Sequence, residues 1–169
     1  NRTNTYSGVI NVDEEYIEEV FKDKKMEKTI LEAIRNNRVE VFYQPIYSTV
    51  SNRFVAAEAL VRIRDEEGGL IFPGSFIEIA ERTGLILGLG SRVFQNVCKF
   101  IKENDISKYG IDYIEVNLSM VQCSYEHLAD NFIAIMKHYE VEPKYINLEI
   151  TETATSNERQ TLLNNMHKL

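Results

Sequence analysis

Apolar and polar residues alternate along several segments of the chain, and amphipathic helical patterns lie between them. The clearest alternation runs from Phe54 to Arg64. Successive side chains of a strand point to opposite faces of a sheet. One face of this segment would carry Val55, Ala57, Ala59, Val61 and Ile63, and the other Glu58, Leu60, Arg62 and Arg64. The pattern predicts a strand with one buried face and one polar face.

The same two periodicities predict the other elements of the chain. Residues 1–12 are polar without a clear period, so we expect a tail there. Further strands are expected at Val39–Ile46, Tyr113–Leu118 and Tyr145–Ile150. Helices are expected at Asp13–Asn37, Ser75 to about Arg82, about Ser91 to Glu103, Tyr125–Tyr139, and from Thr155 to the end of the chain. Strands that alternate with amphipathic helices indicate an α/β fold with parallel pairing.

Local signals at helix ends support these boundaries. The spacings of Ser75 with Glu78 and of Thr155 with Glu158 predict two capping boxes. Gly84 is well placed to end a helix. Gly84, Gly88 and Gly90 resemble a phosphate-binding loop, but they follow a helix instead of a strand. We therefore expect a helix stop and a turn at these three glycines.

Bulk properties describe one globular unit of 169 residues, 44% hydrophobic and 27% charged. No apolar run reaches the roughly 18 residues of a spanning helix, and no signal-peptide pattern is present. The chain begins at Asn1 without methionine and stops inside a predicted helix. We therefore expect a piece of a longer protein, which leaves open an upstream membrane segment.

Charge and cysteine usage narrow the function classes. The net charge of −7, without a block of lysine or arginine, argues against a nucleic-acid duplex as partner. An anionic small ligand would need divalent cations or a local arginine. Cys98 and Cys123 have neither CxxC spacing nor a disulfide framework around them. We therefore expect both cysteines to be buried thiols in a reducing compartment, the cytoplasm.

Glu58 is polar in a strand that otherwise reads as buried, and two later strands repeat this pattern. Asn117 and Glu149 alternate with apolar neighbours in the same way. A carboxylate facing inward needs a cation or a solvated cavity. One alternative is an ordinary ion pair of Glu58 with Arg62 or Arg64. Three oxygen-bearing side chains on three strands favour a site for a hard cation, Mg²⁺ or Mn²⁺ or even Ca²⁺, over zinc.

The histidines offer a weaker signal. His127 and His138 fall in one predicted helix, eleven residues apart. Metal ligands on one helix are spaced by three or four residues, so we expect both to be solvated surface residues. No Ser–His–Asp or Cys–His constellation stands out.

Five segments of the chain form a recognisable series of motifs. They are Tyr43-Gln44-Pro45-Ile46, Glu58-Ala59-Leu60-Val61-Arg62, Phe72-Pro73-x-x-Phe76-Ile77-x-x-Ala80-Glu81-x-x-Gly84, Val116-Asn117-Leu118-Ser119-x-x-Gln122 and Leu148-Glu149-Ile150-Thr151-Glu152. In order and approximate spacing these segments resemble the motifs of the EAL domain family. The resemblance covers about residues 38–169, which leaves 1–37 as a tail and linker helix.

The resemblance implies a TIM-like (β/α)₈ barrel whose first strand runs antiparallel to its neighbour. It also implies a metal-dependent phosphodiesterase that hydrolyses cyclic di-GMP, a bacterial second messenger, to pGpG with Mg²⁺ or Mn²⁺. Two metal ions would neutralise charge and generate hydroxide. Ile63 departs from the family, which commonly has tryptophan there; the expected effect is on packing near the pocket.

The resemblance also assigns roles to single residues. Glu58, Asn117 and Glu149 match metal ligands, and Glu58, Glu149 and Glu152 match residues needed for catalysis, with Glu152 supporting the site through a loop. The substrate-binding residues are Gln44 near a guanine, Leu60 lining the nucleotide pocket, and Arg62 at a phosphate, where a bidentate arginine is well suited.

About half of such a barrel is present, because a (β/α)₈ unit needs around 250 residues. The family's later Asp-Asp-Phe-Gly strand end, lysine, glutamates and glutamine have no counterpart here. We expect the fragment alone to be inactive, and either to associate or to stand for a longer chain, because its sheet would keep an unpaired edge. Alternatives are a module that binds cyclic di-GMP without cleaving it, or a dimerisation and relay module. Candidate partners are a second copy and an upstream diguanylate cyclase, sensory or membrane domain.

Overall fold

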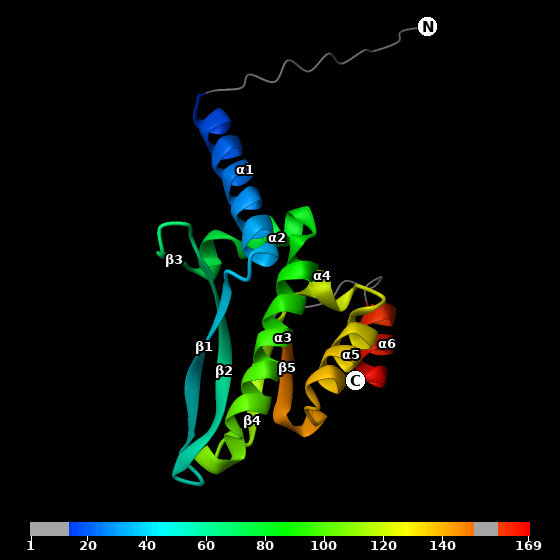
Figure 1. Cartoon of the computed structure of the whole chain (residues 1–169). Helices are drawn as coiled ribbons and strands as arrows, with labels where there is room; N and C mark the ends of the chain where they lie inside the picture. Colours follow the sequence, from blue (N-terminus) through cyan, green and yellow to red (C-terminus); the bar gives the residue numbers. More distant parts are fainter. Residues whose placement is uncertain (1–13, 151–158) are drawn as a thin grey trace, which may run out of the picture.

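The computed structural model describes residues 14–150 and 159–169 (Figure 1). The strands are β1 (Val39–Ser48), β2 (Arg53–Arg64), β3 (Leu70–Ile71), β4 (Tyr113–Leu118) and β5 (Ile146–Ile150). The helices are α1 (Glu14–Arg35), α2 (Ile77–Thr83), α3 (Leu85–Asn104), α4 (Met120–Cys123), α5 (Leu128–Tyr139) and α6 (Arg159–Lys168). Short 3₁₀ turns cover Pro73–Ser75, Ile106–Tyr109 and Pro143–Tyr145. The α/β fold expected from the periodicities is confirmed.

One sheet organises the described residues, with strand order β1-β2-β4-β5 and β3 paired to β2. β1 runs antiparallel to β2, whereas β2, β4 and β5 are parallel to one another. The expected antiparallel first strand is therefore confirmed. Within the described part of the chain, β1 and β5 form the two edges of this path. The sheet is open, as a segment of a barrel wall would be.

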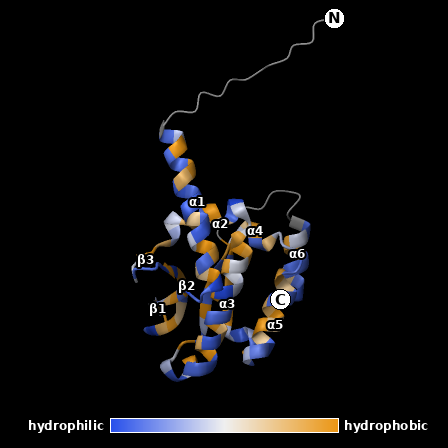
Figure 2. Ribbon diagram, turned by 45° about the horizontal axis from the view of Figure 1, so that its top comes forward, coloured by the Kyte–Doolittle hydropathy of each residue, from blue (hydrophilic) through white to orange (hydrophobic). Residues whose placement is uncertain are grey.

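The core lies between the apolar face of the sheet and α3. The alternation in β2 is confirmed, since Ala57, Ala59 and Ile63 are buried together with the apolar stripe of α3. Phe94 of α3 stacks on Phe132 of α5 with ring centroids 3.8 Å apart, which locks the two helices together. Figure 2 shows hydrophobic residues running along α3 and α5. One apolar face therefore holds the helices, and the opposite face remains available for polar groups.

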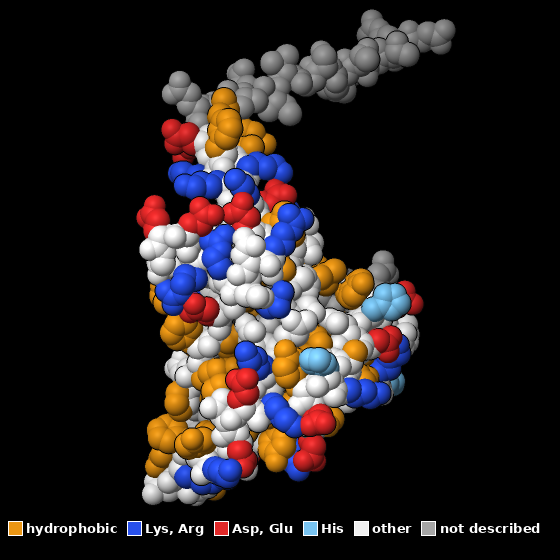
Figure 3. All heavy atoms as spheres, viewed as in Figure 1, with side chains coloured by type: hydrophobic (Ala, Val, Ile, Leu, Met, Phe, Trp, Pro, Cys, Tyr) orange, Lys and Arg blue, Asp and Glu red, His pale blue; other side chains and the backbone are white. Residues whose placement is uncertain are grey.

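Helix α1 has two dissimilar parts. Near its carboxyl end, Ile30 and Ala33 are fully buried in the common core. Near its amino end, Ile17, Val20 and Phe21 are exposed. Figure 3 shows hydrophobic side chains at this projecting end, among charged ones. The last turns of α1 therefore belong to the packed unit.

The glycines after α2 behave differently from expectation. Gly84 does end α2, with φ at 74° and its N–H donating to Glu81 O at 3.2 Å. However, α3 begins at Leu85, so Gly88 and Gly90 lie inside a helix and the predicted turn is wrong there. A reason is visible at Gly90, where a Cβ would lie 1.9 Å from Gln122 Nε2. Close packing, rather than a turn, requires glycine at this position.

Some predicted helix starts are also wrong. Ser75 lies in a 3₁₀ turn, and α2 starts after Phe76 without a side-chain cap, so the Ser75–Glu78 capping box does not form. A capping box exists instead at Ser119 and Gln122 of α4, a helix that the periodicity missed. The helix expected from Tyr125 starts at Leu128. The predicted Thr155–Glu158 box lies outside the described residues.

Cysteines and histidines follow the sequence-based expectation. Cys98 and Cys123 are buried and free. His138 is exposed in α5, and His127 is exposed at the residue that precedes this helix. Among the described residues, no helix has the length and apolarity to cross a membrane.

Candidate metal and substrate site

The polar face of the sheet gathers the predicted site residues through strand register. Gln44 of β1 lies opposite Glu58 of β2, and Glu58 lies opposite Glu115 of β4. Asn117 of β4 lies opposite Glu149 of β5. Glu58, Glu115 and Asn117 alternate with buried apolar neighbours. The register places Gln44 and Glu149 opposite members of this group, so all five side chains project from the same face. The structure therefore brings Glu58, Asn117 and Glu149 together, as predicted.

A direct contact joins the first two predicted ligands. Asn117 Nδ2 donates a hydrogen bond of 2.7 Å to Glu58 Oε1. A parallel contact follows one step along the strands, where Asn147 Nδ2 donates to Glu115 Oε2 at 3.0 Å. Sequence reasoning did not single out Glu115 or Asn147. Their signal was available, because each stands two residues before a predicted ligand and so shares its face.

Negative charge is concentrated on this face. The pKa of Glu149 lies above its usual range because Glu115 shares a hydrogen bond with it and repels its charge. Burial and the charge of Glu58 raise the same pKa further. Carboxylates crowded in this way resist simultaneous ionisation unless a cation compensates them. The local charge therefore suits a bound cation.

The donor set can be compared with the cation that the sequence predicts. In residues 14–150 and 159–169, no three His, Cys, Asp or Glu side chains form a metal-binding group. The predicted set has two carboxylates, from Glu58 and Glu149, and the amide of Asn117 as its third member. Oxygen donors of this kind favour Mg²⁺ or Mn²⁺ over zinc. The residues present therefore fit a hard cation.

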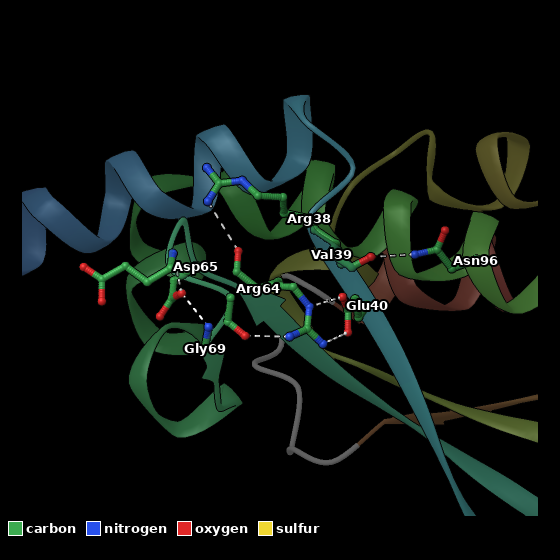
Figure 4. Close-up of polar contacts among 9 residues, drawn as sticks. Arg38, Val39, Glu40, Arg64, Asp65, Gly69 and Asn96 are labelled. Carbon is green, nitrogen blue, oxygen red and sulfur yellow. Dashed lines mark hydrogen bonds and ion pairs between the residues drawn. The ribbon is translucent and has the colours of Figure 1, made fainter.

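The alternative role of Glu58, an ion pair with Arg62 or Arg64, is wrong for the part of the chain that the structure describes. Arg64 instead binds Glu40, with Nη2 2.8 Å from Oε2 (Figure 4). Its hydrogen bond holds the pKa of Glu40 below the usual range. Arg64 Nη1 donates to Gly68 O at 2.7 Å. Arg62 donates to Val61 O at 2.7 Å. In the described part of the chain, the hydrogen-bond partner of Glu58 is thus the amide of Asn117.

A cavity of about 740 Å³ opens beside these residues. The β2–β4 pairing ends at Ala59 and Val116, and the cavity lies where the two strands separate. Its lining combines residues of the polar face, of the segments after β3 and of the core-facing side of α3: Glu58, Leu60, Asn117, Glu149, Pro73, Gly74, Glu78, Glu81, Ile86, Leu89 and Val93. This volume lies within the range of about 300–1,000 Å³ that is common for small-ligand sites.

The remaining predicted residues take different places. Leu60 lines the cavity directly. Gln44 projects from β1 opposite Glu58, and Arg62 follows two residues after Leu60 on the same face of β2. Glu152 lies outside the described residues. The structure therefore places the predicted metal ligands Glu58 and Asn117 at one end of the polar face and Arg62 at the other, the arginine end.

Residues 27–169 match the family model of the EAL domain. The chain belongs to the EAL domain family. It is 32% identical over 121 residues to the probable cyclic di-GMP phosphodiesterase PdeB of Escherichia coli, covering 72% of this chain and 23% of PdeB. It is 30% identical over 122 residues to MucR of Pseudomonas aeruginosa, a bifunctional diguanylate cyclase/cyclic di-GMP phosphodiesterase, covering 72% of this chain and 18% of MucR.

Solved structures agree with this assignment. The PaMucR phosphodiesterase, in complex with c-di-GMP, matches with a TM-score of 0.74 and 27% identity, over 85% of this chain and 60% of that chain. The EAL enzyme Bd1971, with cAMP and cyclic di-GMP bound, matches in fold with a TM-score of 0.75 at 22% identity, over 89% of this chain and 43% of that one. The described sheet is therefore part of a TIM-like barrel of the EAL type.

Proposed function

We propose that this chain is the amino-terminal part of a metal-dependent phosphodiesterase that hydrolyses cyclic di-GMP to pGpG. The cluster of Glu58, Asn117 and Glu149 on three adjacent strands carries the proposal, because it supplies oxygen ligands at one end of a nucleotide-sized cavity. The relatives named as cyclic di-GMP phosphodiesterases support cyclic di-GMP as the substrate. The chain spans between 16% and 23% of the first three curated relatives, so the complete activity belongs to a longer protein.

Glu58, Asn117 and Glu149 would hold Mg²⁺ or Mn²⁺. For this, the Asn117 amide would present its oxygen, while Glu58 and Glu149 bind as carboxylates. When bound, the metal supplies charge neutralisation at the phosphodiester and lowers the pKa of a water. The crowding of Glu149 by Glu115 and Glu58 supports this role, since a cation relieves the repulsion.

The substrate would lie along the polar face towards Arg62. Arg62 would hold a phosphate through two parallel N–H donors, which fix its orientation as well as its charge. Gln44 would meet a guanine, and Leu60 would give the cavity its apolar wall. Glu152 would support the metal ligands from the segment that follows β5. Catalysis of this kind depends on positioning and electrostatics, so single ligand losses are severe.

We further propose that residues 1–169 alone are inactive. The edge strand β5 and the open polar face would need the rest of a barrel to enclose the substrate. The exposed amino-terminal part of α1 would lead to an upstream domain, such as a cyclase, a sensor or a membrane segment. The exposed Ile17, Val20 and Phe21 of α1 favour contact with such a domain or with a second copy.

Turnover by the complete natural polypeptide that contains these residues tests the proposal. With Mg²⁺ or Mn²⁺ it should convert cyclic di-GMP to pGpG, as followed by chromatography, and EDTA should stop the reaction. Glu58→Gln should reduce kcat by at least a hundredfold, whereas Glu103→Gln, an exposed carboxylate on α3, should leave it unchanged. Binding without pGpG release would favour the non-catalytic alternative. Full turnover in Glu58→Gln would refute the metal assignment.

A further inference from the structure

Two exposed phenylalanines flank the guanidinium of Arg62. Arg62 Cζ lies 4.6 Å from the ring centroid of Phe72 and 6.0 Å from that of Phe42. Both distances fall within the range of a cation–π contact. The rings remain 57% and 44% exposed, respectively, despite this contact. Arg62 therefore covers only part of each ring, and aromatic surface stays open to solvent.

The positions of the two rings place them at the arginine end of the site. Phe42 lies opposite Leu60 in the β1–β2 register and is two residues from Gln44 on the same face of β1. Phe72 comes directly before Pro73, which lines the cavity with Leu60. The rings come from two separate segments, yet both meet the same arginine. A ligand that spans the cavity towards Arg62 would thus reach aromatic surface there.

We infer that Phe42 and Phe72, with the Arg62 guanidinium between the two segments, form a stacking site for a purine base of the cyclic dinucleotide. This inference rests on the proposed function and adds residues that set affinity for the base. Aromatic rings and guanidinium planes both stack with bases, and each stacked base contributes about 1–3 kcal/mol. Exposed aromatic surface beside a phosphate-binding arginine suits a nucleotide better than a simple phosphodiester.

A merely structural role would predict a different pattern of effects. If Phe72 served only to pack against Arg62, leucine would preserve most of the contact, and any loss would appear in kcat through a misplaced arginine. If Phe72 stacks with a base, leucine removes the flat ring face while tryptophan retains it. The loss should then appear in Kd and KM, with kcat kept within about threefold because uniform binding has been removed.

The test measures cyclic di-GMP affinity by calorimetry in EDTA and steady-state kinetics with Mg²⁺, using the complete natural polypeptide. Phe72→Leu and Phe42→Leu should each raise Kd and KM by about 5–100-fold, which corresponds to the loss of one stacked base. Phe72→Trp should retain the affinity. Phe54→Leu is the matched control, because Phe54 is a similarly exposed ring at the other end of β2, in contact with Tyr47.

Failures of the two proposals would look different. No binding of cyclic di-GMP by the unaltered protein would overturn the proposed function and, with it, the stacking site. Binding without hydrolysis would overturn only the catalytic proposal, and the affinities of the variants would still decide on stacking. Normal binding that is unchanged in both leucine variants, or a loss confined to kcat, would overturn the stacking site alone.

Discussion

Asn117 Nδ2 lies 2.7 Å from Glu58 Oε1, which joins the middle of β2 to the end of β4 on the polar face of the sheet. In this geometry the Asn117 amide donates to the Glu58 carboxylate. The carboxylates of Glu149 and Glu115 lie close together on the same face and repel each other. The amide is therefore a neutral partner at a place where a further negative charge would be repelled. This relationship makes Asn117 a sensitive reporter of whether a cation binds.

Asn117→Asp should separate the metal-free and metal-bound states. Without metal, the added carboxylate faces Glu58 and should lower the Tm, because like charges at this distance repel. With Mn²⁺, the same variant should show a larger upward shift of Tm than the unaltered protein, since a ligand that binds only the folded state stabilises it. Calorimetry with and without Mn²⁺ measures both effects. Equal metal shifts in the two proteins would contradict a ligand role for Asn117.

The exposed Asn164 on α6 is the control for this charge change. Asn164→Asp adds the same charge away from the polar face of the sheet. Its Tm should respond to Mn²⁺ as that of the unaltered protein does. A shift as large as that of Asn117→Asp would point to nonspecific metal binding.

Gly90→Ala should destabilise the protein by about 1–2 kcal/mol. Its Cβ would lie 1.9 Å from Gln122 Nε2, so the buried Gln122 side chain would have to move. That side chain closes the capping box of α4 by accepting from Ser119 N–H at 3.2 Å. Urea unfolding gives the change. A stability equal to that of the unaltered protein would contradict the close contact.

Gly88→Ala is the matched comparison within the same helix. There a Cβ would lie 3.6 Å from Ile34 Cδ1, an ordinary contact. Alanine also lowers the entropy of the unfolded chain, so the variant should be stabilised by roughly 0.5–1 kcal/mol. Opposite signs at Gly88 and Gly90 would show that packing, and not helix propensity, decides the outcome at Gly90.

These two glycines illustrate why part of the fold escaped sequence analysis. The alternation of apolar residues identified β1, β2, β4 and β5 because burial on one face is a local and repeated signal. Gly88 and Gly90 carry an equally local turn signal, but the contact with Gln122 overrides it. The distant partner that decides the conformation lies thirty-two residues away in sequence, where periodicity has no information.

The candidate site, like the fold, could be predicted in part. Glu58, Asn117 and Glu149 were found because each interrupts an apolar strand. Glu115 lies on the same face. Its position opposite Glu58 and Asn147, however, depends on how β2, β4 and β5 pair. The contact of Arg62 with Phe42 and Phe72 depends on the path of the chain after β3, which no sequence period describes. Strand patterns therefore identified the candidate ligands, whereas their surroundings became visible only in the tertiary structure.

Asn165→Asp should destabilise the packing of α6. The Asn165 side chain is buried, donates from Nδ2 to Cys123 O at 3.0 Å and to Tyr125 O at 2.9 Å, and accepts from Ala129 N–H at 3.4 Å. A carboxylate would face two carbonyl oxygens that it cannot satisfy, at a cost of about 2–4 kcal/mol. Urea unfolding should show this loss, together with faster hydrogen exchange at Ala129. Exchange as slow as in the unaltered protein would contradict the buried role of Asn165.

Alkaline pH should weaken the fold through Cys98. Burial raises the pKa of the Cys98 thiol to about 12, whereas an exposed thiol titrates near 8.5. Between these values the unfolded chain loses a proton that the folded protein keeps, so the free energy of unfolding falls as pH rises. The contribution is complete below about pH 8.5 and is progressively lost towards pH 12.

Urea unfolding at pH 7.5, 9 and 10 should therefore show falling stability, and a thiol reagent should leave Cys98 unmodified in the folded protein at pH 8. Tyr43 belongs to the same response, because burial, and secondarily the charge of Cys98, also raise its pKa. Cys98→Ala should lower stability at pH 7.5 through the lost volume, yet flatten the decline between pH 9 and 10. A decline as steep as in the unaltered protein would assign the alkaline sensitivity to other groups.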